Sequence, residues 1–216
     1  MHRKQQMNKE REEKDVAAGQ IWAAYDDIEG LPRYYFKVKE IHSRDPFKAN
    51  ITWLELRNMS VEQRALKERG YHPVCGANFR GSSSQIVNSV DIFSHVINWE
   101  KGPKGTIKIY PTKGEVWAIY RGRKSGILSK RKTSSFTYDI VEIVGNYDEQ
   151  TGVTVAYLVK LFHYKSVFKP SKVISSIPVE EFYSFSYQVP AHRLKENEAP
   201  GIEEGFWELD PASLPR

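Results

Sequence analysis

The chain has 216 residues, of which 40% are hydrophobic and 12% aromatic, and its formal net charge is +5. Such a chain holds one large domain or two of about 100 residues each, and its apolar content excludes wholesale disorder. No apolar run approaches the roughly 20 residues of a membrane span, and the single cysteine, Cys75, excludes an internal disulfide framework. We therefore expect a soluble protein of a reducing compartment, the nucleus or alternatively the cytosol.

The predicted elements begin after a charged lead-in. Residues 1–15 contain Lys, Arg, Asp and Glu in near balance and lack the apolar stretch of a secretory signal, so we expect them to be disordered. IWAAY (21–25) alternates its side chains at the period of two that is typical of a strand. The turn DDIEGLP follows, and then two further predicted strands, RYYFKVKEI (33–41) and FKANITWLEL (47–56).

Helices are expected to be few. The segment 60–70 begins with Ser60 as a predicted N-cap and ends on Gly70, which together indicate a helix. In IPVEEFYSF (177–185), Pro178 holds a first-turn position with acidic residues behind it, which predicts a short helix.

The second half of the chain again reads as strands. GEVWAIY (114–120) precedes a long basic stretch, and FTYDIVEIV (136–144) follows that stretch. The turn GNYDEQTG then leads into GVTVAYLVKLF (152–162), so we expect a hairpin with both faces substantially buried.

Four landmarks occur twice, in the same order. The pairs are GQIWAAY and GEVWAIY, with Trp22 and Trp117; ITWLEL and AYLVKL; IFSHVI and FSYQVP; and GTIKIYP and GFWELDP. Four ordered pairs indicate a tandem duplication into units 16–111 and 112–216. The predicted fold is mainly β with few short helices, built as two tandem small β-barrel-like units of the SH3 or Tudor kind.

Several of these motifs also carry a family resemblance. They are GQIWAAYDDIEGLPRYY, ITWLE, HPVCGANF, IFSH, IYPTKGEVWAIY, AYLVKLF, FSYQVPAHRL and WELDPASLP. Over about Gly19 to Pro215 the chain resembles the plant domain of unknown function found C-terminal to the J-domain of DnaJ-type proteins, and also found alone. We take this chain as a stand-alone member. The resemblance implies no assigned activity, although members with a J-domain would act as co-chaperones and some members are linked with chromatin and transcription.

The sequence departs from full-length members of that family in two ways. It has no His-Pro-Asp tripeptide, so stimulation of an Hsp70 ATPase is not expected. The stretch after GEVWAIY is also unusually basic, which leaves partner specificity through this loop open.

No motif for catalysis or cofactor binding is present. The chain lacks a nucleophile elbow, a phosphate-binding glycine loop and a dinucleotide fingerprint. His72 and Cys75 form one close pair with His95 downstream, whereas a zinc site usually needs two close pairs. We predict that the chain is not an enzyme, that it has no cofactor or metal, and that these three residues are structural.

Aromatic residues on the first strands form one candidate binding site. Trp22, Tyr25 and Tyr34, with Asp26 in the turn, could form an aromatic cage for a methylated lysine, because a methylated ammonium is attracted to ring faces. The second unit would offer Trp117, Tyr120 and Tyr138. The alternative is that these rings fill the core of each unit, and a tryptophan repeated in both units suits that role equally.

A basic loop at 121–132 is the other candidate. Its cations are Arg121, Arg123, Lys124, Lys130, Arg131 and Lys132. Such a run favours phosphate backbones or nuclear import, and it is also compatible with a solvated loop. We expect a protein-interaction module whose partner is a protein or peptide, with a modified histone-like or transcription-linked tail as one candidate. The alternatives are a nucleic-acid-associated protein that contacts DNA or chromatin through 121–132, and a J-domain-less partner of chaperone assemblies. No membrane partner is expected.

Overall fold

The computed structural model describes residues 12–57, 59, 61–121, 136–198 and 200–214. These residues form two compact units. The first unit takes its described residues from Met1–Met59 and Ala77–Tyr110, and the second from Ser60–Gly76 and Pro111–Arg216. Each unit contains one seven-stranded antiparallel sheet and few short helices, so the prediction of a mainly β chain with two repeat units is confirmed.

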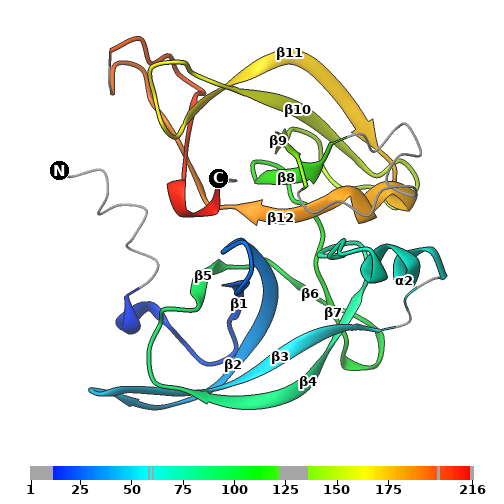
Figure 1. Ribbon diagram of the computed structural model, residues 1–216, viewed down its shortest axis with the longest axis vertical. Coiled ribbons are helices and arrows are strands. Elements are labelled where there is room, and N and C mark those ends of the chain that lie inside the picture. The colour runs from blue at the N-terminus through cyan, green and yellow to red at the C-terminus, as the bar shows by residue number, and fades with distance from the viewer. Residues whose placement is uncertain (1–11, 58, 60, 122–135, 199, 215–216) are drawn as a thin grey trace. The chain divides into compact units, whose positions relative to one another are not determined.

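The first unit is organised around one curled sheet (Figure 1). Its strands are β1 (Ile21–Tyr25), β2 (Pro32–Arg44), β3 (Phe47–Arg57), β4 (Asn78–Val87), β5 (Phe93–Val96), β6 (Glu100–Lys101) and β7 (Ile107–Lys108), in the order β5-β1-β2-β3-β4-β7-β6. Its core cluster includes Trp22, Phe36 and Phe93, all with no exposed surface. The rings of Phe36 and Phe93 meet edge to face with centroids 4.6 Å apart.

The second unit repeats this arrangement. Its strands are β8 (Val116–Tyr120), β9 (Tyr138–Ile143), β10 (Val153–Lys160), β11 (Val167–Ile177), β12 (Phe185–Val189), β13 (Ala191–Arg193) and β14 (Trp207–Leu209), in the order β12-β8-β9-β10-β11-β14-β13. The predicted hairpin is β9 and β10, whose strands pair antiparallel from Val155–Ile143 to Leu158–Ile140.

The two strand orders match position by position. The four repeated landmarks fall on β1 and β8, β3 and β10, β5 and β12, and β7 and β14, which hold equivalent places in the two sheets. The sequence repeat is therefore a repeat of topology, and the duplication is visible in the fold.

The helices connect or terminate the strands. They are α2 (Val61–Glu68) and the 3-10 turns η2 (Glu13–Asp15), η3 (Pro103–Gly105), η6 (Val179–Ser184) and η7 (Pro211–Ser213). The helix predicted at 60–70 is α2, and the short helix predicted at 177–185 is η6. The predicted cap Ser60, and most of the lead-in 1–15, lie outside the described residues. No helix in the described part of the chain is both long and apolar enough to cross a membrane.

The segment 61–76 runs between β3 and β4 but packs with the second unit, although the predicted range of the first unit, 16–111, contains it. Tyr71 meets the rings of Tyr120 and Phe136 at centroid distances of 4.7 and 4.8 Å. Gly76 lies against the ring of Phe182, where an added Cβ would come within 2.7 Å of a ring carbon. These aromatic contacts hold the segment against β8 and η6.

Candidate functional site

The repeated Gly-x-(Ile/Val)-Trp motif builds the same tight turn in both units. In the first unit, the backbone N–H of Gln20 donates to the carbonyl of Ala17. Gly19 between them has φ +92°, the left-handed region that the third residue of such a turn requires. In the second unit, Glu115 donates to Thr112 in the same way, and Gly114 has φ +88°.

The residue after each glycine then anchors the tryptophan of its own unit. Gln20 Oε1 accepts from the indole Nε1 of Trp22 at 2.9 Å and from the backbone N–H of Ala17 at 2.7 Å. Glu115 Oε2 accepts from Trp117 Nε1 at 2.9 Å, and also from the backbone N–H of Thr112 at 2.9 Å. The motif therefore satisfies a buried indole N–H and a turn amide with one side chain.

Both indoles are closed inside their units. Trp22 and Trp117 have no exposed surface. Trp22 packs edge to face on Phe93 at 5.3 Å, and Trp117 packs on Phe185 at 5.5 Å. Phe93 and Phe185 are the phenylalanines of the repeated Phe-Ser landmark, so the two landmarks meet in the core of each unit. A closed indole offers no ring face to a ligand.

The other candidate cage residues differ in exposure. Tyr34 is 42% exposed, whereas Tyr25 is half-buried and Asp26 is 7% exposed. Of the four, Tyr34 alone presents a large part of its side chain to solvent. The aromatic cage stays a prediction, and binding of a methylated lysine there would require Trp22 to leave its packed position.

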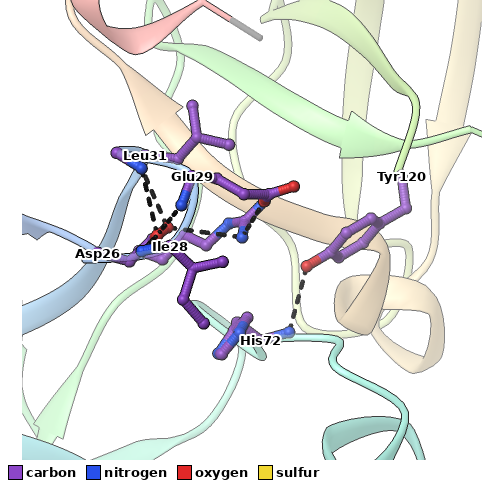
Figure 2. A network of polar contacts seen from close by, with 8 residues as sticks. Asp26, Ile28, Glu29, Leu31, His72 and Tyr120 are labelled. Carbon is purple, nitrogen blue, oxygen red and sulfur yellow. Dashed lines mark hydrogen bonds and ion pairs between the residues drawn. The ribbon is translucent and has the colours of Figure 1, made fainter. Parts of the chain in front are cut away.

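The Asp26 carboxylate organises the loop between β1 and β2 (Figure 2). Its Oδ1 accepts from the backbone N–H groups of Ile28 at 2.8 Å and Glu29 at 2.6 Å, and its Oδ2 accepts from Leu31 at 3.3 Å. The buried guanidinium of Arg33 lies 3.5 Å from Oδ2 and also pairs with Glu29. These contacts occupy the carboxylate and leave Ile28, at the loop tip, 90% exposed.

The basic loop begins at the equivalent position of the second unit. Arg121 donates from Nε to Asp139 Oδ1 at 2.9 Å and from its guanidinium to the carbonyl of Tyr138 at 3.2 Å. The other five predicted cations, Arg123, Lys124, Lys130, Arg131 and Lys132, lie outside the described residues. Nucleic-acid contact through 121–132 therefore stays a prediction.

The aromatic residues that the second unit would contribute to a cage are also packed. Tyr120 is 1% exposed, and its hydroxyl accepts from the backbone N–H of His72 at 3.2 Å (Figure 2). Tyr138 is 9% exposed and packs on Tyr120 and Tyr187.

Cys75 and His72 belong to the second unit, whereas His95 belongs to the first. Cys75 is buried in the second unit with Sγ 3.9 Å from the carbonyl of Phe182. Burial, and then the negative charge of Glu115, raise the pKa of this thiol well above its usual range. His95 is 4% exposed in the first unit, and its Nδ1 lies 2.9 Å from Ser94 Oγ. No group of three or more His, Cys, Asp or Glu suited to a metal ion occurs within the described ranges.

An open strand edge on the first unit is the feature that the sequence reasoning missed. β4 pairs with β3 along its length, from Asn78–Arg57 to Val87–Ala49. On its other side β4 pairs with β7 at Asn78 and Phe79, and no described strand continues that ladder. All seven residues from 80 to 86 are exposed. We call residues 81–87 the β4 edge.

The equivalent edge of the second unit, on β11, carries residues that disfavour pairing with an additional strand. β11 pairs with β14 at Val167 and Phe168, and its following residues include Lys169, Pro170 and Lys172. Lysine and proline on a sheet edge discourage the addition of another strand. The β4 edge, GSSSQIV, contains neither a charged residue nor a proline. Its one irregularity is a bulge opposite Trp53.

The sequence of the β4 edge gave little signal for a strand. Glycine and serine have low strand propensity, and three successive serines show no alternation of polar and apolar residues. The repeat held the only available signal, because β4 is the counterpart of β11, whose residues VFKPSKVISSI include recognisable β-branched positions.

The chain belongs to the family described as a domain of unknown function, DUF3444, whose model matches residues 2–198. Comparison with curated proteins and with solved structures finds no match to the chain.

Proposed function

We propose that this protein is a non-enzymatic protein-interaction module that binds an extended segment of a partner by strand addition at the β4 edge. The observation that carries the proposal is a run of exposed strand residues that no described strand pairs on one side and that lacks edge-protecting charges or proline. An unpaired edge is a ready template for another strand.

The energetics suit a reversible interaction. Each backbone hydrogen bond contributes about 0.5–1.5 kcal/mol net, so four or five of them offset much of the cost of ordering a short segment. Main-chain pairing supplies affinity, and side-chain contacts on the two faces supply selectivity.

The two faces of the β4 edge differ in chemistry. On the outer face, Ile86 is 44% exposed and offers an apolar contact. On the inner face, Gln85 Oε1 accepts from Trp53 Nε1 at 2.8 Å, which places an aromatic side chain near the edge. Ser84 Oγ lies 3.2 Å from Thr52 Oγ1 and accepts from Lys39 Nζ at 3.2 Å. We expect the bound segment to alternate polar and apolar residues.

The biological setting of the proposal comes from the sequence resemblance to plant DnaJ-associated domains, and the family match itself gives only a domain of unknown function. On that basis we propose a nuclear role with a chromatin-linked or transcription-linked protein segment as the partner. A client or subunit of a chaperone assembly is the alternative source of the segment.

Peptide selection tests the binding mode. Random peptides displayed on phage and selected against the full chain should yield extended sequences. The backbone amides of a bound peptide point alternately toward β4 and away from it. N-methylation of the set that faces β4 should lower the affinity of the peptide about tenfold or more, whereas N-methylation of the other set should change it little. Ile86→Asp should also weaken binding, whereas Val173→Asp, an exposed position on β11, should leave it unchanged. Equal effects of N-methylating either set of amides would contradict strand addition.

A further inference from the structure

An open basic pocket of about 570 Å³ lies at the start of β4, next to the β4 edge. It is lined by Arg57, Asn78, Arg80, Pro103, Lys104 and Thr106. All six residues belong to the first unit, on the last residue of β3, the start of β4 and the loop around η3.

Three of the six lining residues, Arg57, Arg80 and Lys104, are cations. Within the described residues, no carboxylate forms an ion pair with Arg57, Arg80 or Lys104. Glu55 is the strand neighbour of Arg80 in the β3–β4 register, and it does not line the pocket. Three like charges around one hollow repel one another unless an anion joins them.

The wall of the pocket is held in place by its own polar contacts. Thr106 Oγ1 donates to the carbonyl of Pro103 at 2.8 Å and lies 3.2 Å from Asn78 Oδ1. The guanidinium of Arg80 donates to the carbonyl of Lys104 at 3.3 Å. The backbone N–H of Gly102 donates to the carbonyl of Thr106 at 2.7 Å. Position 102 has no room for a side chain, because an added Cβ would clash with Thr106 Oγ1. The cations are therefore mounted on an organised loop and strand.

We propose that this pocket binds a phosphomonoester, carried by a phosphorylated side chain of the segment that pairs with the β4 edge. A phosphomonoester carries a charge of about −1.5 to −2 at neutral pH and three acceptor oxygens, which suit two guanidinium groups and an ammonium better than one carboxylate does. Arg80 precedes Gly81 on the same strand, so a segment paired with the β4 edge would lead its phosphorylated residue to Arg80. This inference rests on the proposed function.

The test uses the full chain and three probes: inorganic phosphate, free phosphoserine, and serine and phosphoserine forms of the selected peptides. Arg57→Gln, Arg80→Gln and Lys104→Gln remove one charge each from the pocket, and Lys172→Gln on β11 is the matched control. Calorimetry should show that the phosphoserine peptide binds about tenfold or more tightly than its serine form. Arg57→Gln and Arg80→Gln should abolish that gain, while Lys172→Gln retains it.

The outcomes separate the pocket from the edge. Equal affinity for serine and phosphoserine forms overturns the pocket while strand addition stands. A phosphate gain that survives Arg57→Gln and Arg80→Gln also overturns it. If free phosphoserine binds tightly and no peptide is selected, the phosphate is not carried by a paired segment. That result would overturn both this inference and the proposed function. Binding of duplex DNA through these arginines, at phosphodiesters of single charge, would likewise contradict the proposal.

Discussion

Gln20 and Glu115 show how one local interaction can be made by two different residues. Both accept one hydrogen bond from a buried indole and one from a turn amide. An amide oxygen suffices in the first unit, whereas a carboxylate does the same work in the second. We therefore expect the turn to depend on the acceptor oxygen of Glu115 and not on its negative charge.

Glu115→Gln should consequently retain the stability of the second unit, and Glu115→Ala should lower the free energy of unfolding by about 1–3 kcal/mol, because two donors would lose their acceptor. Urea unfolding followed by tryptophan fluorescence measures both changes. Gln20→Ala should produce a loss of the same order in the first unit. A Glu115→Gln variant as unstable as Glu115→Ala would show that the charge itself matters.

Cys75 gives the molecule a predictable dependence on alkaline pH. Because the pKa of its thiol is raised in the folded state, the folded protein retains this proton more tightly than the unfolded chain does. The associated stability is fully present below the unfolded pKa of about 8.5 and declines as pH rises toward the folded pKa, by at most about 1.4 kcal/mol per pH unit.

The free energy of unfolding should therefore fall more steeply between about pH 8.5 and 10 for the wild-type chain than for Cys75→Ala. Tyrosines and lysines titrate in both proteins, so the difference between the two curves isolates the thiol. Parallel curves would contradict a raised pKa. The thiol should also react with a disulfide reagent only after unfolding.

At the scale of elements, the turn before β10 depends on one glycine. Gly152 has φ +79°, and an added Cβ would lie 2.0 Å from the carbonyl oxygen of Ile177 and 2.7 Å from Cα of Pro178. Both neighbours are backbone atoms of the adjoining strand end, so relief would require the β10–β11 pairing to shift. Asp148 completes this turn by accepting from the backbone N–H groups of Gln150 and Thr151.

Gly152→Ala should therefore destabilise the second unit by well over the roughly 1–2 kcal/mol of a left-handed alanine alone. Gly201→Ala is the matched control, because Gly201 has φ +71° and no atom within 4 Å of an added Cβ. Comparing the thermal unfolding of the two variants separates the cost of the steric clash at position 152 from the cost of placing alanine in the left-handed region. Equal losses of stability in the two variants would mean that the β10–β11 pairing shifts at little cost to accommodate the added Cβ.

The elements also show what sequence reasoning could and could not reach. The landmarks that predicted strands at 21–25 and 51–56 combine aromatic or β-branched residues with alternation, and these strands contribute Trp22, Ala24 and Ile51 to the core. The β4 edge could not be predicted because its residues 81–83, Gly-Ser-Ser, are exposed and carry no apolar pattern. A binding surface made of exposed backbone groups places few requirements on side-chain identity, so the sequence predicts it poorly.

For the whole molecule, the duplication was predictable and the packing of its connections was not. Four ordered landmarks lie on equivalent strands of both sheets. Segment 61–76 packs with the second unit through Tyr71, whose ring partners Tyr120 and Phe136 are distant in sequence. The charges around the basic pocket likewise come from three separate stretches, and only the β3–β4 register and the η3 loop bring them together.

The two units have kept one framework while their surfaces have diverged. The short loop fixed by Asp26 in the first unit corresponds to the basic stretch that follows Tyr120 in the second. The β4 edge is open, whereas β11 carries Lys169, Pro170 and Lys172. This asymmetry suggests that strand addition is a task of the first unit, and that the second unit contributes structure or a different contact.

Hydrogen exchange on the full chain, with and without a selected peptide, tests the central claim most directly. We predict that bound peptide slows amide exchange in residues 80–87 at least about tenfold, because amides that face solvent on the open side of β4 become hydrogen-bonded. Exchange along 169–177 of β11 should stay unchanged and serves as the internal control. Slowed exchange around β1 and Tyr34, with residues 80–87 unaffected, would contradict strand addition and return the binding site to the aromatic residues of the first strands.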